Sequence, residues 1–269
     1  MSAAPDPPAA APAAAPPDVL AEIIGATRRR IAAACAPSTR FSAALTAGRD
    51  EGRVALIAEH KRASPSAGTI RDDLELADVV GAYERAGAAA LSVLTEPERF
   101  GGRLADITAV RSVTGLPILR KDFIVDPIQV HEAAVAGADA ILLIVAAFPG
   151  RPAELAGLAG LAGRLGLEVL MEVHDASELE IALELEAPII GINNRDLSTL
   201  RVDLETTFAL RPRIPAGTVV VAESGFSTPE QIRALAAAEV DAVLMGEALM
   251  RSADIAAAAR AIATATPGG

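Results

Sequence analysis

Six charged side chains stand at the ends of short apolar runs, where they could take part in catalysis or bind an anionic ligand. They are three carboxylates and three cations: Glu59, Glu172, Glu223, Lys61, Lys121 and Arg195. Their formal charges balance, which is how several charges can share a poorly hydrated site. A structural ion-pair cluster would use the same residue types, but their recurrence at successive runs favours a catalytic site.

The runs are short, β-branched and apolar on both faces, and helical patterns rich in Ala, Leu and Glu lie between them. This alternation is typical of parallel strands joined by helical crossovers. Eight such units match a (β/α)8 TIM barrel, an α/β fold, better than an open doubly wound sheet. No Gly-x-Gly-x-x-Gly follows the first run, so the main signature of a Rossmann fold is missing. The predicted strands cover residues 54–59, 90–94, 117–121, 140–145, 168–172, 189–193, 219–223 and 242–246.

A barrel predicts where the polar residues meet, because the loops after its strands build the active site. Side chains alternate along a strand, so Glu59 and Lys61 share one face, as do Asn193 and Arg195. We therefore expect each pair to point into the mouth of the barrel.

Small residues after the last two predicted strands indicate a phosphate site. Ser224-Gly225 and Gly246-Glu247 lie where barrel loops and a helix amino end present free backbone N–H groups. A glycine at either place could instead ease a tight turn. Lys61, just before the loop that contains Ser64, and Arg195 could add positive charge.

Four of the six phenylalanines, Phe100, Phe123, Phe148 and Phe226, lie just after predicted strands. In a chain with so few aromatic residues, this clustering indicates a ring-bearing ligand that contacts at least one of them. Phe100 is the first candidate, because Gly101-Gly102 beside it lets its loop move. The other three are alternatively packing residues.

Composition excludes several classes of function. The net charge of −11 disfavours nucleic-acid and anionic-membrane partners. No apolar run reaches the length of about 18 residues that spans a bilayer.

The lone cysteine, Cys35, permits no internal disulfide, and with no secretory signal we expect a cytoplasmic protein. No histidine pair has a metal-ligand spacing, so we expect no metal and no cofactor, and only His174 could face the barrel mouth.

The amino-terminal region differs from the rest of the chain. Residues 1–17 are mostly Ala and Pro, which predicts a disordered tail. From Val19 the pattern becomes helical, which predicts a leading helix that includes Ile24 and Cys35. Residues 18–269 are expected to form one barrel domain with this helix at its start.

At these positions the sequence resembles the indole-3-glycerol phosphate synthase family. The family closes an indole ring from 1-(2-carboxyphenylamino)-1-deoxyribulose 5-phosphate in tryptophan biosynthesis, with loss of carbon dioxide and water. That substrate would bring a phosphate, a phenyl ring and a carboxylate to the contacts inferred above. The carrying motifs are AEHKRASPS at 58–66, LTE at 94–96 with FGG at 100–102, LRKDF at 119–123, MEVH at 171–174, GINNRDL at 191–197 and AESG at 222–225.

The resemblance implies a role for each candidate residue. Lys121 would be the general acid for ring closure, and Glu172 and Glu59 would be the acid/base carboxylates of the dehydration. Lys61 would bind an anionic group or serve as a second acid. Asn193, Ser224 and Arg195 would orient the substrate, and Gly225, Gly246 and Glu247 would bind its phosphate through backbone N–H groups. Ser64, Phe100 and Glu223 are further candidate substrate-binding residues.

The sequence also departs from the family pattern. His60 stands where an apolar residue is usual, and Ala67 stands where a lysine is common, which removes a positive charge from the first loop. Association with other tryptophan-pathway enzymes is a further possibility that the resemblance raises, while oligomeric state and a role in secondary metabolism are left open.

Related phosphate-binding barrels fit less well. Phosphoribosylanthranilate isomerase needs a cysteine in the first strand, where Glu59 stands, and orotidine phosphate decarboxylase needs Asp-x-Lys-x-x-Asp, which Lys121-Asp122 does not supply. A non-catalytic phospholigand-binding paralogue would lack an acid or a base, and none is missing here.

Overall fold

The computed structural model describes residues 24–26, 39–64, 68–71 and 73–266. The expected tail of residues 1–17 and most of the expected leading helix lie outside the described residues. Of that helix only residues 24–26 are described, and they are helical. The part of the chain that the structure describes contains no helix with the length and the apolar character of a membrane span.

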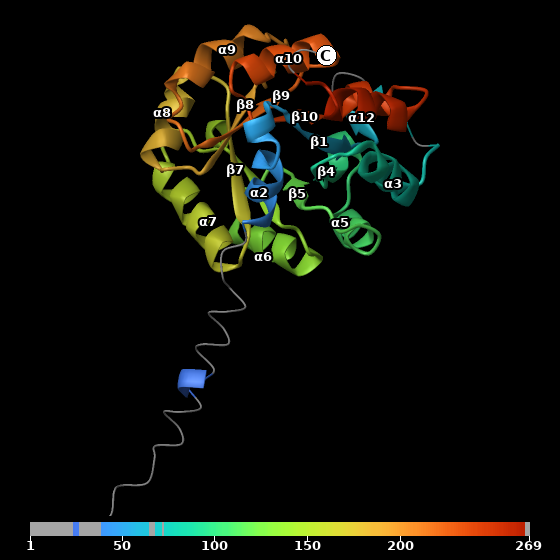
Figure 1. Ribbon diagram of the computed structural model, residues 1–269. Coiled ribbons are helices and arrows are strands. Elements are labelled where there is room, and N and C mark those ends of the chain that lie inside the picture. Colours follow the sequence, from blue (N-terminus) through green and yellow to red (C-terminus); the bar gives the residue numbers. More distant parts are fainter. Residues whose placement is uncertain (1–23, 27–38, 65–67, 72, 267–269) are drawn as a thin grey trace, which may run out of the picture. The chain divides into compact units, whose positions relative to one another are not determined.

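Eight parallel strands close into a barrel in the order β1-β10-β9-β8-β7-β6-β5-β4 (Figure 1). Every one of them lies within one residue of a predicted strand, which confirms the predicted (β/α)8 fold. The strands are β1 (Ala55–His60), β4 (Ala90–Leu94), β5 (Ile118–Lys121), β6 (Ala140–Ile144), β7 (Glu168–Val173), β8 (Ile189–Asn193), β9 (Val219–Glu223) and β10 (Ala242–Met245).

Helices surround the barrel between successive strands, and a short antiparallel pair, β2 (Ala63–Ser64) and β3 (Gly68–Thr69), follows β1. The α-helices outside the barrel wall are α3 (Leu76–Ala86), α4 (Pro97–Phe100), α5 (Leu104–Arg111), α6 (Pro127–Ala136), α7 (Pro152–Arg164), α8 (Ala176–Glu184), α9 (Glu205–Leu210), α10 (Pro229–Ala237), α11 (Glu247–Met250) and α12 (Ile255–Ala263). Single 3-10 turns are η1 (Arg49–Glu51), η2 (Val145–Ala147) and η3 (Arg211–Arg213).

Local sequence signals explain where several helices begin. Helix α6 starts with a capping box, in which Asp126 accepts from the helix backbone and Gln129 accepts from the Asp126 N–H at 3.1 Å. Thr228 and Gln231 form the same box at the start of α10. Each helix also has proline at its first position, where no hydrogen bond is lost.

Strand alternation divides the apolar residues into two layers. One set packs inside the barrel and includes Ile57, Leu142 and Leu244. Their strand neighbours, such as Leu56, Leu143 and Val243, pack between the strands and the outer helices. The last inward position of each strand therefore lies at the open, carboxyl end of the barrel.

Helix α2 (Arg40–Thr46) closes the opposite end of the barrel interior. Phe41 and Leu45 are fully buried among the interior residues of the strands. The carboxylate of Glu168, at the start of β7, accepts from the Phe41 N–H at 2.7 Å and from the Ser42 N–H at 3.2 Å. This helix was not expected from the sequence, and it anchors the bottom of the barrel with a charge-assisted cap.

Replacement of Phe41 by alanine is expected to lower the free energy of unfolding by about 3–5 kcal/mol, because it opens a cavity at the barrel floor. Urea denaturation followed by circular dichroism measures the change. Val135→Ala is the matched control, since that side chain is 89% exposed, and it should stay within about 0.5 kcal/mol. A loss below about 1 kcal/mol for Phe41→Ala would show that α2 does not support the barrel.

Candidate active site

A cavity of about 390 Å³ lies at the carboxyl ends of the barrel strands. It is lined by twelve of the thirteen site residues that the sequence predicts. The exception is Ser64, which lies in β2 and whose side chain is outside the described part of the structure. The twelve are Glu59, Lys61, Phe100, Lys121, Glu172, Asn193, Arg195, Glu223, Ser224, Gly225, Gly246 and Glu247.

Lys121 stands between two buried carboxylates on the cavity floor. Its Nζ lies 3.3 Å from Glu172 Oε2 and 3.5 Å from Glu223 Oε2. Burial opposes the charge on Lys121, but the negative charge of Glu172, with smaller contributions from Glu223 and Glu59, raises its pKa above the usual value. The ammonium group is therefore charged and held on the inner face of the barrel.

The two carboxylates beside Lys121 differ in protonation. Burial opposes ionisation of Glu172, yet the positive charge of Lys121, followed by polar interactions with His174 and Asn193, lowers its pKa to about 2. Burial, followed by the charge of Glu172, raises the pKa of Glu223 to about 8. Neither oxygen of Glu223 has a hydrogen-bond partner among the described residues. At neutral pH the site thus pairs an ionised carboxylate with a largely neutral one.

Glu59 and Lys61 form a second ion pair on the inner face of β1. Lys61 Nζ lies 3.1 Å from Glu59 Oε1. The Ser92 hydroxyl donates to Glu59 Oε2 at 3.2 Å, which holds the carboxylate in place. The expectation that Glu59 and Lys61 point into the same mouth is confirmed.

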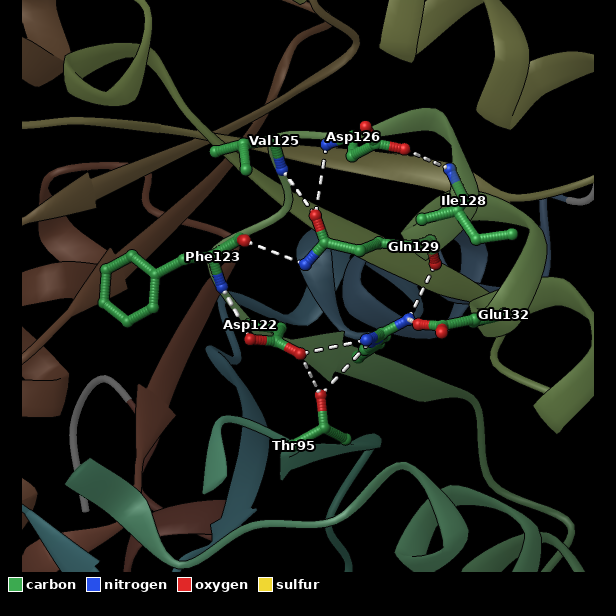
Figure 2. A network of polar contacts seen from close by, with 9 residues as sticks. Thr95, Asp122, Phe123, Val125, Asp126, Ile128, Gln129 and Glu132 are labelled. Carbon is green, nitrogen blue, oxygen red and sulfur yellow. Dashed lines mark hydrogen bonds and ion pairs between the residues drawn. The ribbon is translucent and has the colours of Figure 1, made fainter. Parts of the chain in front are cut away.

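A network of polar side chains holds the end of β5, the strand that carries Lys121, from outside the barrel (Figure 2). Arg120 points out of the barrel, where its guanidinium donates to Thr95 Oγ1 at 3.1 Å, to the Gln129 carbonyl at 2.6 Å and to Asp122 Oδ2 at 3.0 Å. Thr95 in turn donates to Asp122 at 2.6 Å. The network joins the ends of β4 and β5 to α6 and so restricts the position of Lys121.

Aromatic side chains lie on one side of the cavity. The rings of Phe100 and Phe123 are 6.4 Å apart between centroids and tilted by 38°. Both line the cavity. Phe226 also lines it, but from the loop after β9. Phe148 does not line it, because its ring is buried in the outer layer with Arg151 above it. Of the four phenylalanines singled out in the sequence, Phe148 is thus a packing residue.

The loops after β9 and β10 form the opposite side. Ser224 and Gly225 both have positive φ, at 63° and 91°. A Cβ on Gly225 would come within 2.5 Å of Val202, so only glycine fits there. Gly246 precedes α11, whose backbone begins at Glu247.

Sequence reasoning missed several lining residues. Arg251, just after α11, lines the cavity and pairs with Glu247 at 3.1 Å. Leu142 and Ile144 also line it, and their spacing of two along β6 was a signal that could have found them. Arg251 had no comparable signal, since it follows the short helix α11 rather than a strand.

The three histidines occupy different environments. His60 is buried, and burial followed by the charge of Arg62 lowers its pKa to about 4. His131 is exposed on α6. His174 contacts Glu172, with 3.3 Å between Nε2 and Oε1. Within the described ranges no group of three His, Cys, Asp or Glu side chains is arranged to hold a metal ion.

Solved structures similar to this chain support the fold. The 3-hexulose-6-phosphate synthase of Salmonella typhimurium has a TM-score of 0.62 at 16% identity, covering 79% of this chain and 98% of that one. KGPDC from Streptococcus mutans, solved in complex with D-R5P, has a TM-score of 0.59 at 14% identity, covering 77% and 94%. At these identities the likeness concerns the barrel alone.

Proteins similar to this chain in sequence indicate its family as well as its fold. A family model for indole-3-glycerol phosphate synthase matches residues 20–262. The indole-3-glycerol phosphate synthase of Aromatoleum aromaticum is 47% identical over 235 residues, which cover 87% of this chain and 88% of that protein. That of Dehalococcoides mccartyi is 53% identical over 211 residues, covering 77% and 81%. On these matches, the chain belongs to the indole-3-glycerol phosphate synthase family.

Proposed function

We propose that the protein converts 1-(2-carboxyphenylamino)-1-deoxyribulose 5-phosphate to indole-3-glycerol phosphate, carbon dioxide and water, as a step of tryptophan biosynthesis. The observation that carries the proposal is the position of Lys121, a charged ammonium group held between two carboxylates on the floor of the cavity. The cavity also combines aromatic side chains on one side with glycine loops on the other, which suits a substrate with a phenyl ring and a phosphate.

In ring closure, Lys121 is the general acid. The aromatic ring carbon attacks the ketone carbon of the substrate, and the ketone oxygen gains negative charge as the carbon–oxygen double bond becomes single. This oxygen is a far better proton acceptor than the ketone, so Lys121 delivers its proton as the charge develops. The aromatic carboxyl group then leaves as carbon dioxide.

Dehydration requires an acid that protonates the departing hydroxyl group and a base that removes a proton from the newly closed ring. Glu172 and Glu59 are the acid/base carboxylates, because both are buried and both line the cavity. Lys61, 3.1 Å from Glu59, binds an anionic group of the substrate or serves as the second acid.

Other residues hold the substrate. Backbone N–H groups at Gly225, Gly246 and Glu247 bind the phosphate, because loops and helix amino ends in this part of a barrel favour anions. Asn193, Ser224 and Arg195 orient the sugar chain. Phe100 packs on the phenyl ring of the substrate. Glu223 and Ser64 make further contacts with the substrate.

Purified protein incubated with the substrate, without added metal, is expected to produce indole fluorescence. Glu172→Gln removes a catalytic carboxylate while keeping its shape, so the variant should lose about 10²- to 10⁴-fold in kcat. If the parent binds the substrate tightly but forms no product, the protein is a phospholigand-binding paralogue instead. If the variant turns over like the parent, Glu172 has no acid/base role.

Lys121→Arg separates proton donation from charge. Arginine keeps the positive charge but does not release its proton at any ordinary pH, so kcat should fall by about 10²- to 10⁴-fold. Binding of indole-3-glycerol phosphate and the circular dichroism spectrum show whether the variant still folds and binds.

Lys61→Arg is the matched comparison for this experiment. It keeps most of the activity if Lys61 only binds an anion, and it loses activity like Lys121→Arg if Lys61 is an acid. Near-parental turnover of Lys121→Arg would remove proton donation from the role of Lys121.

A further inference from the structure

His174 lies between two carboxylates, and its ring is oriented by one of them. Glu178, in the first turn of α8, accepts from the His174 backbone N–H at 2.8 Å and faces the ring nitrogen Nδ1 at 2.9 Å. The other ring nitrogen, Nε2, faces Glu172 Oε1 at 3.3 Å, within ion-pair distance but without a hydrogen bond among the described residues. Glu178 thus fixes the backbone and the ring of His174 together.

This arrangement is attractive in one protonation state only. A neutral imidazole has one nitrogen with a hydrogen and one with a lone pair, so one carboxylate would face a lone pair. Both contacts are favourable when both nitrogens carry hydrogen, which makes the ring an imidazolium. Although burial opposes the charge, hydrogen bonds and charges from Glu172 and Glu178 raise the pKa of His174 to about 10, in agreement with the geometry.

Glu172 is therefore held by two cations, one at each oxygen. Lys121 contacts Oε2 and His174 contacts Oε1, while the side chain of Glu172 is only 1% exposed. When Lys121 gives up its proton, the buried carboxylate loses one compensating charge, and a buried carboxylate without a partner is costly. A cation on the opposite oxygen offsets that loss.

We infer that His174 is a positioning residue which, oriented by Glu178, keeps Glu172 ionised and in place while Lys121 transfers its proton. The inference rests on the proposed function for its kinetic part, but the charge state of His174 can be tested without turnover. Two further titratable groups lie near this pair: Asp175, whose pKa is lowered in part by His174, and Glu223, which faces Glu172 across Lys121.

Imidazole nitrogen spectra of the ¹⁵N-histidine-labelled protein test the charge directly, because the chain has three histidines. His174, assigned with the variant His174→Gln, should be doubly protonated at neutral pH and remain so to about pH 9, well above the ordinary value of about 6.5. His60 should be neutral in the same spectrum. Glu178→Gln removes one neighbouring charge and should move the His174 midpoint downward. Titration of His174 near its ordinary value would overturn the inference.

The pH dependence of kcat/KM tests the role. Loss of a neighbouring cation raises the pKa of Glu172 from about 2 into the range of about 3–5, so the ratio of kcat/KM for His174→Gln to that of the parent should fall as the pH is lowered through this range. In the His174→Gln background, Glu178→Gln should add little, since its effect passes through the histidine. His131→Gln, on an exposed residue of α6, is the matched control and should follow the parent at every pH.

The outcomes of the two experiments are distinguishable. A loss that is equal at every pH indicates a structural role only and contradicts the inference. If the parent forms no product, the proposed function fails and the kinetic role of His174 fails with it, whereas the nitrogen spectra still decide whether His174 is charged.

Discussion

The ion pair between Lys121 and Glu172 is the interaction on which the rest of the site depends, because neither charge would survive in the barrel interior alone. The Lys121 side chain is 16% exposed and that of Glu172 is 1% exposed. Removing one partner would leave the other as a buried charge without its main counter-charge. The surroundings of the pair are built to keep both in place: Arg120 holds the strand end of Lys121 from outside the barrel, and His174 faces the second oxygen of Glu172.

Space for the carboxylates comes from two glycines in the inner row of the barrel. A Cβ on Gly191 would lie 2.2 Å from Glu223 Oε1, and a Cβ on Gly246 would lie 2.5 Å from Glu59 Oε1. Neither glycine is among those with positive φ, so backbone freedom does not explain them. Because these glycines have no side chain, the inner faces of β8 and of the segment after β10 leave room for carboxylates from neighbouring strands.

Alternation along the strands made most of the fold and of the cavity predictable. Parallel strands buried on both faces leave a clear apolar pattern, and the period of two assigned Glu59 and Lys61 to the same inner face. What the pattern could not predict depends on how separate elements meet. Helix α2 seals the barrel through a carboxylate more than 120 residues away, at Glu168. His174 and Glu178 have a helical spacing, but their relation to Glu172 depends on the direction in which α8 leaves β7.

The distribution of lysine and arginine along the chain also supports the roles proposed for Lys61 and Lys121. Lys61 and Lys121 are the only lysines among the 24 basic residues of the sequence. Structural ion pairs elsewhere, such as those of Arg49 with Asp241 and Arg62 with Asp106, use arginine, whose guanidinium stays charged and binds carboxylates with fixed geometry. An ammonium group differs in that it is compact and can release a proton. Both residues with that property line the cavity, so lysine occurs in this chain only where the proposed reaction needs a cation that can also serve as an acid or bind an anionic group.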